Sequence, residues 1–330
     1  MKVMNEKCCW KNPVWAPSQC YRITTPSLVT ATKLLRTLIT NNNEVQALLD
    51  TIKPTDTIAI DLECENNLHR YGVFCCLIQV QHDTTYLIDA LSVDKELVKQ
   101  LFLHPCTKLF HDVTFDFRVI QHEYGCVPVN HKDTQLAAML IAEEKLGYGS
   151  LVEKYLGVTI DKHGQRADWS QRPLPKNLLD YAALDVVYLE ALYNKLLEKL
   201  GDKVAWLNEE CAYRETVNWP LHVPHWTDLK HLGTLTQRQL YKAQYLWTER
   251  ERIAKELDKP SYKIISNKNI IRCVEGERVP ANKLMIPLLK RWPGTGEMLP
   301  EKEHVKYDLK ELKELRNTKA EQHHVTPDIL

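Results

Sequence analysis

The sequence contains no apolar run long enough to cross a membrane. A spanning helix needs roughly 18 consecutive apolar residues, and no segment approaches that length. Residues 1–20 carry charges but lack the apolar stretch of a secretory signal, so we expect no signal peptide. These absences predict a soluble intracellular protein without a membrane partner, located in the cytoplasm or, if the source is eukaryotic, in the nucleus.

The spacing typical of zinc sites is also missing. The 10 cysteines are scattered, some are adjacent, as in Cys8 and Cys9 or Cys75 and Cys76, and none stand in C-x-x-C spacing. Adjacent cysteines do not easily bind one zinc ion together, and without a signal peptide the expected compartment is reducing. We therefore expect free thiols. The segment 147–150 matches neither a dinucleotide-binding nor a phosphate-binding loop and is expected to be a turn.

The chain has no net charge, since 43 Lys and Arg balance 43 Asp and Glu, which argues against a general nucleic-acid coat protein. The charges are nevertheless unevenly distributed. Residues 221–330 contain 20 Lys and Arg against 15 Asp and Glu, whereas residues 1–220 contain 23 against 28. An acidic part joined to a basic part is typical of a metal-binding catalytic domain beside a phosphate-binding one. Solvated helices often differ by as much, so this pattern alone leaves both interpretations open.

At 330 residues the chain is long enough for two domains that each bury a core. We expect an irregular leader over residues 1–27, an α/β domain over 28–218, a linker rich in Pro and His over 219–233, a helical domain over 234–310 and a charged tail over 311–330. We find no internal repeat and no low-complexity tract in this order.

Hydrophobic spacing predicts the secondary structure of both domains. The clearest strand covers residues 57–65, and strands over 73–81 and 85–88 follow after short turns, which predicts an antiparallel meander. The other expected elements are helices over 28–49, 94–103, 114–124, 134–144, 150–156 and 175–200, and strands over 108–111 and 127–129. After the linker we expect helices only, beginning with a capping box formed by Thr236 and Gln239.

Asp61 and Glu63 are the first candidate site residues. Alternation along the predicted strand places both carboxylates on one face, about 7 Å apart, and the apolar residues on the other. Several acids on one strand face are electrostatically costly unless a cation is present, and Mg²⁺ or Mn²⁺ prefers carboxylate oxygen. Taken alone, such a pair is more often a solvated edge face.

Asp116, Tyr181 and Asp185 complete the candidate set. Asp116 follows a strand and should lie in the first turn of a helix, where a plain N-terminal acid is the simpler interpretation. Tyr181 and Asp185 stand four residues apart on a predicted helix, so their side chains share a face. A core tyrosine with a surface acid would give the same pattern. Combined, the four acids suffice for two divalent ions that cleave a phosphodiester, with Tyr181 orienting the attacking water.

Three stretches resemble the exonuclease motifs of the DEDD superfamily, in the family's order: AIDLECEN at 59–66, LFHDVTFDFRVI at 109–120 and YAALDVVYLEALY at 181–193. The segment QRADWSQRPLP at 165–175 resembles the one that precedes the third motif in ribonuclease D. This resemblance implies an RNase H-like fold, a mixed sheet flanked by helices. It also implies four metal ligands and the tyrosine subclass of the superfamily. The residues it assigns are Asp61, Glu63, Asp116 and Asp185 as ligands and Tyr181 as the subclass tyrosine.

The segment 234–260 resembles the HRDC domain, a small all-α module of ribonuclease D and certain helicases that is associated with nucleic-acid binding. Two departures from bacterial ribonuclease D stand out. Cys64 occupies a position that is usually aromatic, and the chain has room for one HRDC-like module where bacterial ribonuclease D has two. Alternation points Cys64 away from the acids, so these departures concern packing and substrate handling more than catalysis.

The sequence and this resemblance together predict a 3′→5′ exonuclease that uses two Mg²⁺ or Mn²⁺ ions, and the resemblance to ribonuclease D alone implies that it is an exoribonuclease. It would release nucleoside 5′-monophosphates from single-stranded RNA in RNA maturation or decay. The alternatives are a DNA exonuclease of the same superfamily and a nucleic-acid-binding module without turnover. His111, Gln165 and Arg166 are candidate RNA contacts, although a strand-end histidine is more often structural and loop residues are usually solvated. Protein partners cannot be inferred from the sequence.

Overall fold

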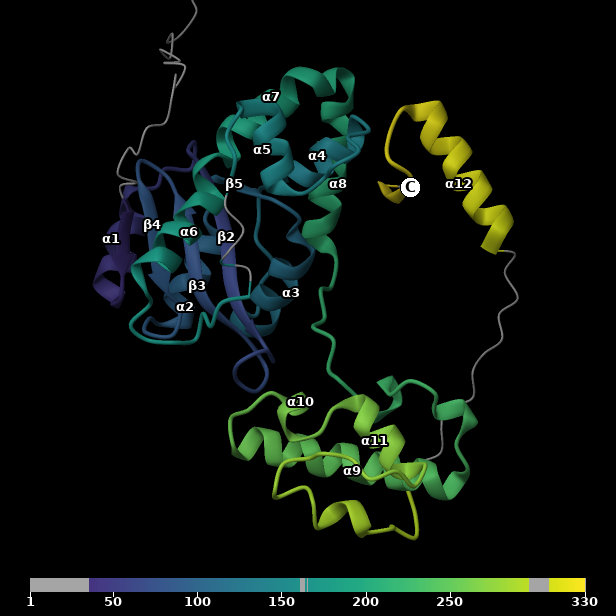
Figure 1. Ribbon diagram of the computed structural model, residues 1–330. Helices are drawn as coiled ribbons and strands as arrows, with labels where there is room; N and C mark the ends of the chain where they lie inside the picture. The colour runs from purple at the N-terminus through teal and green to yellow at the C-terminus, as the bar shows by residue number, and fades with distance from the viewer. Residues whose placement is uncertain (1–35, 161–163, 165, 297–308, 330) are drawn as a thin grey trace, which may run out of the picture. The chain divides into compact units, whose positions relative to one another are not determined.

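The computed structural model describes residues 36–160, 164, 166–296 and 309–329 of the chain. Its centre is a mixed sheet of six strands in the order β1-β4-β3-β2-β5-β6 (Figure 1). The β2–β3 and β3–β4 pairs are antiparallel, as the predicted meander requires, and the other three pairs are parallel. The strands are β1 Arg36–Ile39, β2 Thr57–Asn66, β3 Val73–Gln81, β4 Thr85–Asp89, β5 Thr107–Phe110 and β6 His131–Asp133.

Strand β2 carries the first two candidate acids and follows the predicted alternation. Ile58, Ile60 and Leu62 are buried in the main core cluster, whereas Ala59 belongs to a smaller cluster on the opposite face. The ladder with β3 shifts register between Glu63 and Cys64, which marks a bulge at the end of the acidic stretch. The face that bears the carboxylates is therefore the one opposite the main core.

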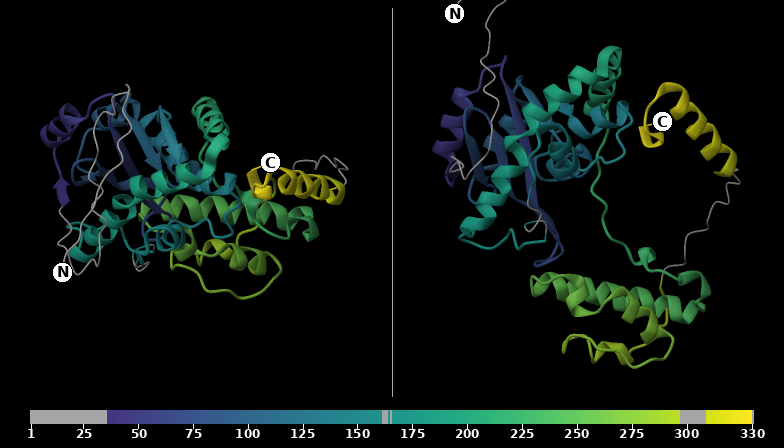
Figure 2. Two further views of the ribbon diagram at one scale, coloured as in Figure 1. Left: turned by 90° about the horizontal axis from the view of Figure 1, so that it is seen from above. Right: turned by 45° about the horizontal axis from the view of Figure 1, so that its top comes forward.

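Helices cover both faces of the sheet (Figures 1 and 2). The main core is closed by α1 Asn42–Thr51, α2 Lys95–Leu103 and α3 Val113–Tyr124. On the other face α6 Lys176–Val187 contacts β2, β3 and β4, and α7 Leu189–Leu200 contacts β2 and β5. Around α7 a further apolar cluster gathers α4, α5 and α8, which are Thr134–Leu140, Tyr148–Leu156 and Val204–Thr216.

The residues from Trp226 to Met285 share an apolar core of their own, which thus begins inside the segment 219–233 that was expected to be a linker. It includes Trp226, Leu246 and Ile270, all at most 2% exposed. The capping box of Thr236 and Gln239 is present as predicted, at the start of the longest helix of this part. The helices that contribute to this core are α9 Gln237–Glu256, α10 Ser261–Ile264 and α11 Asn267–Val274. Helix α12 Leu309–His323, most of which falls in the segment expected to be a charged tail, instead adds Ala320 to the apolar cluster around α7. Short 3₁₀ turns are η1 Gly201–Lys203, η2 Trp226–Asp228, η3 Leu232–Thr234, η4 Leu288–Lys290 and η5 Pro327–Ile329.

Several predicted elements differ from the structure. Of the helix expected over 28–49, residues 28–35 lie outside the described residues, and Arg36–Ile39 is a strand because it pairs with β4. The strand expected over 127–129 lies instead at 131–133, where three polar residues form a strand because they pair with β5. Local pattern did not reveal either strand, because tertiary pairing overrides propensity in such short segments.

The helical predictions also need correction. The helix expected over 175–200 is interrupted at Tyr188, and the helix expected over 134–144 ends at Leu140. Residues 147–150 are the start of α5 rather than a free turn. Helix α8 was not predicted, because it buries only Leu207 and Cys211 and so has a weak apolar stripe.

Two expectations from composition can be compared with the described residues. Seven cysteines fall there and all are free thiols, as predicted. Among the helices of the described ranges, none combines the length and apolar character that crossing a bilayer requires.

Candidate active site

Strand β2 and helix α6 bring three of the predicted acids together. Oxygen atoms of Asp61, Glu63 and Asp185 lie within 4.8 Å of one another, a grouping that could hold a metal ion. The two strand acids share a face because side chains alternate along β2, and α6 crosses that face of the sheet. Carboxylate oxygens are the donors that hard divalent cations prefer, so the residues present fit such a cation.

Asp116 faces the same cluster from helix α3. It lies in the first turn of that helix and is only 6% exposed. Burial raises its pKa well above the usual range, and the charge of Asp61 raises it further. Asp116 also raises the pKa of Glu63, which places its carboxyl within electrostatic reach of the other acids.

The acids of β2 and α6 hold protons far more tightly than free carboxyl groups do. Burial raises the pKa of Asp61 to about 7, and burial with the charge of Asp61 raises the pKa of Asp185 to about 8. The pKa of Glu63 is raised well above normal by burial and then by the charges of Asp61, Asp185 and Asp116. Like charges in a confined site repel, so the cluster gains from a cation that neutralises it.

Tyr181 lies one helical turn before Asp185 on α6. Its side chain forms a hydrogen bond with the Asp185 carboxyl, and this bond partly offsets the rise of the Asp185 pKa. The Tyr181 ring lies 6.1 Å from the ring of Trp169, between centroids. A Cβ atom placed on Gly164 would lie only 2.6 Å from Cγ of Tyr181. The loop before α6 can therefore pack on this ring only because residue 164 lacks a side chain, a constraint that the sequence analysis missed.

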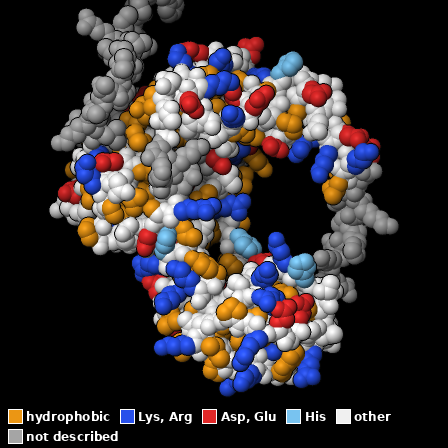
Figure 3. All heavy atoms as spheres, in the orientation of Figure 1, with side chains coloured by type: hydrophobic (Ala, Val, Ile, Leu, Met, Phe, Trp, Pro, Cys, Tyr) orange, Lys and Arg blue, Asp and Glu red, His pale blue; other side chains and the backbone are white. Residues whose placement is uncertain are grey.

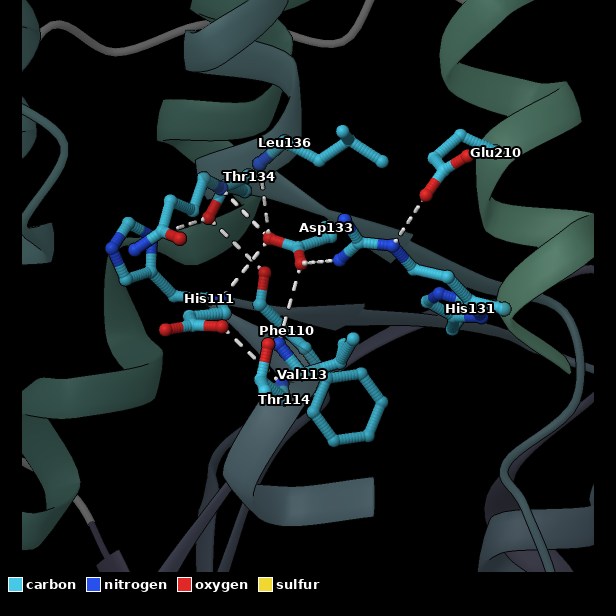
Figure 4. A network of polar contacts seen from close by, with 12 residues as sticks. Phe110, His111, Val113, Thr114, His131, Asp133, Thr134, Leu136 and Glu210 are labelled. Carbon is cyan, nitrogen blue, oxygen red and sulfur yellow. Dashed lines mark hydrogen bonds and ion pairs between the residues drawn. The ribbon is translucent and has the colours of Figure 1, made fainter. Parts of the chain in front are cut away.

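Asp133 holds the start of α3 in place (Figure 4). Its Oδ1 accepts from the backbone N–H of Asp112 at 3.0 Å, and its Oδ2 accepts from that of Val113 at 3.3 Å. The same carboxylate caps α4 by accepting from the N–H groups of residues 135 and 136. Arg214 of α8 donates to Oδ2 at 3.2 Å. Because α3 carries Asp116, this buried carboxylate sets the position of one site acid through its backbone.

Asp112 has an uncommon backbone conformation that this network supports. Its φ is +63°, in the left-handed region, and its own carboxylate accepts from the N–H of Thr114 at 3.3 Å. A non-glycine residue in this region carries a steric cost, and such positions cluster at sites where the surrounding structure fixes them. These hydrogen bonds therefore hold the backbone at the junction between β5 and α3 in a single conformation.

The three candidate RNA contacts have different surroundings. His111 Nδ1 lies 2.8 Å from Thr134 Oγ1, and burial lowers the pKa of this histidine, an arrangement that fits the structural interpretation. Arg166 is exposed, and its backbone oxygen lies 3.2 Å from Nε2 of His69. Gln165 lies outside the described residues. The neighbouring Arg172 pairs with Asp89.

Comparison with known proteins adds independent evidence. Ribonuclease D of Zymomonas mobilis is 38% identical over 188 residues, which cover 52% of this chain and 46% of that protein. Ribonuclease D of Granulibacter bethesdensis is 31% identical over 265 residues, covering 75% of this chain and 65% of that protein. The chain thus spans less than two thirds of the length of either relative.

The fold is also that of a solved structure. The crystal structure of Escherichia coli RNase D superposes with a TM-score of 0.69 at 24% sequence identity, covering 89% of this chain and 87% of that one. At this identity the likeness establishes the fold and confirms the predicted class, a mixed sheet flanked by helices. Residues 37–201, half of the chain, match the family described as 3′-5′ exonuclease, and this segment contains all five predicted site residues. The chain therefore belongs to the 3′-5′ exonuclease family.

Proposed function

We propose that this protein is a 3′→5′ exoribonuclease that removes nucleoside 5′-monophosphates from single-stranded RNA. The observation that carries this proposal is the half-buried acid cluster of Asp61, Glu63 and Asp185, in a chain of the exonuclease family. The charge of the buried Asp116 also acts on Glu63. Four acids crowded into a partly buried site have little value as a scaffold, because like charges destabilise the fold unless a cation binds there.

The four acids would be the ligands of two divalent cations, Mg²⁺ or Mn²⁺. Bound ions supply positive charge that lowers the pKa of a water molecule and stabilises the leaving oxygen of the RNA chain. The acids of β2 enter the site from the sheet, whereas Asp116 and Asp185 approach from two helices. Their raised pKa values mean that protons leave as the cations bind, so occupancy depends on pH.

Tyr181 would orient the attacking water. Its hydroxyl is already bonded to Asp185, and Gly164 and Trp169 fix the plane of the ring. The water oxygen forms a new bond to phosphorus, and the bond from phosphorus to the 3′-oxygen of the preceding nucleotide breaks. The attacking water gives up a proton to the surrounding solvent, and the departing 3′-oxygen takes up a proton from the solvent, so the preceding nucleotide ends in a new 3′-hydroxyl. Fixed geometry of this kind supplies a large part of the rate enhancement in hydrolytic sites.

RNA is proposed as the substrate because both relatives described above are ribonucleases D. The helical part after the linker supports binding of a polyanion. Residues 224–296 contain 14 Lys and Arg against 7 Asp and Glu, and Figure 3 shows Lys and Arg side chains spread over the visible face of this part. We propose that it acts as an HRDC-like RNA-binding module, and that exposed Arg166 contacts phosphate beside the acid cluster.

A time course on 5′-labelled single-stranded RNA, with a DNA strand of the same sequence alongside, tests the proposal. It is run with Mg²⁺, with Mn²⁺, with a chelator, and with the Asp61→Asn and Asp116→Asn variants. We expect a ladder that shortens from the 3′ end only when metal is present, and loss of cleavage in both variants with folding intact.

Cleavage that persists in the Asp116→Asn variant would contradict the assigned site. Faster shortening of DNA than of RNA would favour the DNA exonuclease alternative. RNA that is bound but never shortened, under every metal condition, would favour a binding module without turnover.

A further inference from the structure

Helices α6 and α7 would be one continuous helix if they were not interrupted at Tyr188. Helix α6 ends at Val187, α7 begins at Leu189, and Tyr188 between them has φ −103° and ψ −2°. In an unbroken helix the Tyr188 N–H would donate to the carbonyl of Leu184, four residues earlier. The missing bond therefore lies in the turn that carries Asp185.

The hydroxyl of Tyr148 occupies this gap. It donates to the Leu184 carbonyl at 3.1 Å and accepts from the Tyr188 N–H at 3.3 Å. A side chain inserted in this way satisfies both backbone groups while it holds them apart, which is one of the established causes of a helix bend. Residues 184–188 contain neither Pro nor Gly, so the local sequence supplies no other cause. The bend is thus imposed by a residue from α5.

The Tyr148 ring is itself firmly placed. It lies 5.6 Å from the ring of His111, between centroids, and packs against a small apolar cluster on the acid-bearing face of the sheet. The members of that cluster are Ala59, Leu109, Val186 and Leu189. They come from β2, β5, α6 and α7, so Tyr148 packs against a cluster to which the strand of Asp61 and Glu63 and the helix of Asp185 both contribute. One side chain therefore links two of the elements that build the acid cluster.

We propose that Tyr148 is a positioning residue that orients Asp185 toward Asp61 and Glu63 by holding the bend between α6 and α7. The inference rests on the proposed exonuclease function and deepens it, because it concerns the affinity of the acid cluster for divalent cations. Without the hydroxyl, the Leu184 carbonyl either accepts from the Tyr188 N–H, which straightens the helix, or loses this donor while the Tyr188 N–H keeps its contact with the Val186 carbonyl. Both outcomes turn Asp185 away from its present direction.

The hydroxyl is well suited to this role because it remains a donor. Burial raises the pKa of Tyr148, the Tyr188 hydrogen bond opposes that rise, and the charges of Asp185 and Asp61 add to it. A protonated phenol can donate to one backbone group and accept from the other, whereas phenylalanine can do neither. Tyr148→Phe therefore removes the bridge and keeps the ring.

The test is Mn²⁺ binding to the full chain, measured by calorimetry and by the electron paramagnetic resonance signal of free Mn²⁺. We expect Tyr148→Phe to weaken binding by roughly tenfold or more, the range seen when groups that orient metal ligands are removed. The RNA cleavage rate at saturating Mn²⁺ should recover most of its wild-type value, because the ligands themselves are present. The matched control is Tyr155→Phe, also on α5, whose hydroxyl donates to Glu143 instead and which should bind Mn²⁺ normally.

Equal Mn²⁺ affinity in Tyr148→Phe and the wild type would overturn the inference, and RNA cleavage by the wild type would leave the proposed function standing. Conversely, a wild type that binds Mn²⁺ but never cleaves nucleic acid would overturn the function and not the positioning role. Amide hydrogen exchange on the wild type gives a test that needs no variant. The bridge predicts a protected Tyr188 N–H, and exchange at the rate of an open amide would overturn it.

Discussion

The guanidinium of Arg172 donates hydrogen bonds to both carboxylate oxygens of Asp89, from Nε to Oδ2 at 2.8 Å and from Nη2 to Oδ1 at 2.7 Å. The same Nη2 donates to the carbonyl of Cys76 at 2.8 Å, and Nη1 donates to that of Trp169. One side chain therefore ties the loop before α6 to strands β3 and β4. That loop also contains Trp169, which packs against Tyr181, so the ion pair supports the site from outside it.

Replacing Arg172 by Lys should destabilise the protein by about 1–3 kcal/mol, since lysine cannot make the two-pronged contact and leaves a nearly buried carboxylate poorly bonded. Urea unfolding followed by circular dichroism measures the change. The control is Lys176→Met, because Lys176 is 85% exposed in its pair with Asp180 and its loss should cost less than about 0.5 kcal/mol. A cost at Arg172 no larger than the cost at Lys176 would show that the pair does not support this loop.

The same pair predicts a pH dependence. Burial by itself raises the pKa of Asp89, but the hydrogen bonds and charge of Arg172 outweigh burial and lower it. The stabilisation is therefore present above the unfolded pKa of about 4 and is lost as pH falls through the lower folded pKa. The stability difference between the wild type and Arg172→Lys should accordingly be constant near neutral pH and shrink below about pH 4. Arg172 also donates to the carbonyls of Trp169 and Cys76, and this part of the difference should not depend on pH. A difference that does not shrink at all as the pH falls from 7 to 2 would contradict this account.

Gly164→Ala tests the packing of Tyr181. The added Cβ would overlap the phenol ring, so either the loop or the ring must move. We expect RNA cleavage to fall roughly 10- to 100-fold, mainly in kcat, because small misplacements of an orienting group are costly. Gly233→Ala is the control, since a Cβ there meets no heavy atom within 4 Å. Single-turnover RNA cleavage is measured for both variants, and equal rates would mean that the position of the Tyr181 ring does not affect cleavage.

The acid cluster predicts opposite effects of pH on the metal-free and metal-bound protein. The folded pKa of Asp61 is about 7 and that of Asp185 about 8, both above their unfolded values. Folding therefore binds protons, so the metal-free protein loses stability as pH rises from about 4 towards 8. Divalent cations replace those protons, so their stabilising effect should grow over the same range.

Thermal unfolding at pH 6 and pH 8.5, with chelator and with Mn²⁺, measures this linkage. We expect the Tm gain from Mn²⁺ to be larger at pH 8.5. Asp61→Asn should raise the Tm of the metal-free protein at pH 8.5 and abolish most of the Mn²⁺ effect. Glu44→Gln, an exposed substitution far from the acids in sequence, serves as the control and should change neither quantity. A Mn²⁺ effect that is independent of pH would contradict the assignment of these carboxyls as ligands.

The sequence predicted the parts of this structure that depend on local periodicity. Large apolar residues recur at every second position, Ile58, Ile60 and Leu62, so their strand and the side of its two acids could be inferred without coordinates. The bend at Tyr188 could not, because the residue that causes it lies on another helix. The contact of Gly164 with Tyr181 was likewise invisible, since a loop glycine has many simpler explanations. The sequence did not reveal contacts between segments that lie far apart along the chain.

Asp133→Asn tests whether the Asp133 carboxylate only caps α4 or also supports the candidate active site. Asparagine caps helices as well as aspartate does, so capping of α4 should survive. The amide nitrogen cannot accept, however, and one of the two oxygens that now bond Asp112, Val113 and Arg214 is lost. We expect a loss of about 2–3 kcal/mol in stability and a shift of Asp116 that lowers the cleavage rate.

The control is Asp94→Asn, because Asp94 caps α2 through the N–H groups of Glu96 and Leu97 and supports no site residue. Urea unfolding and RNA cleavage are measured on both variants. Asp94→Asn should be nearly neutral in both, since its carboxylate serves the cap alone. If Asp133→Asn proves equally neutral, Asp133 is a cap and nothing more, and the position of Asp116 must be set by the packing of α3. Loss of cleavage in Asp133→Asn alone would instead show that the buried Asp133 carboxylate fixes the position of Asp116 among the candidate metal-binding acids. It would do so through the backbone of Asp112 and Val113.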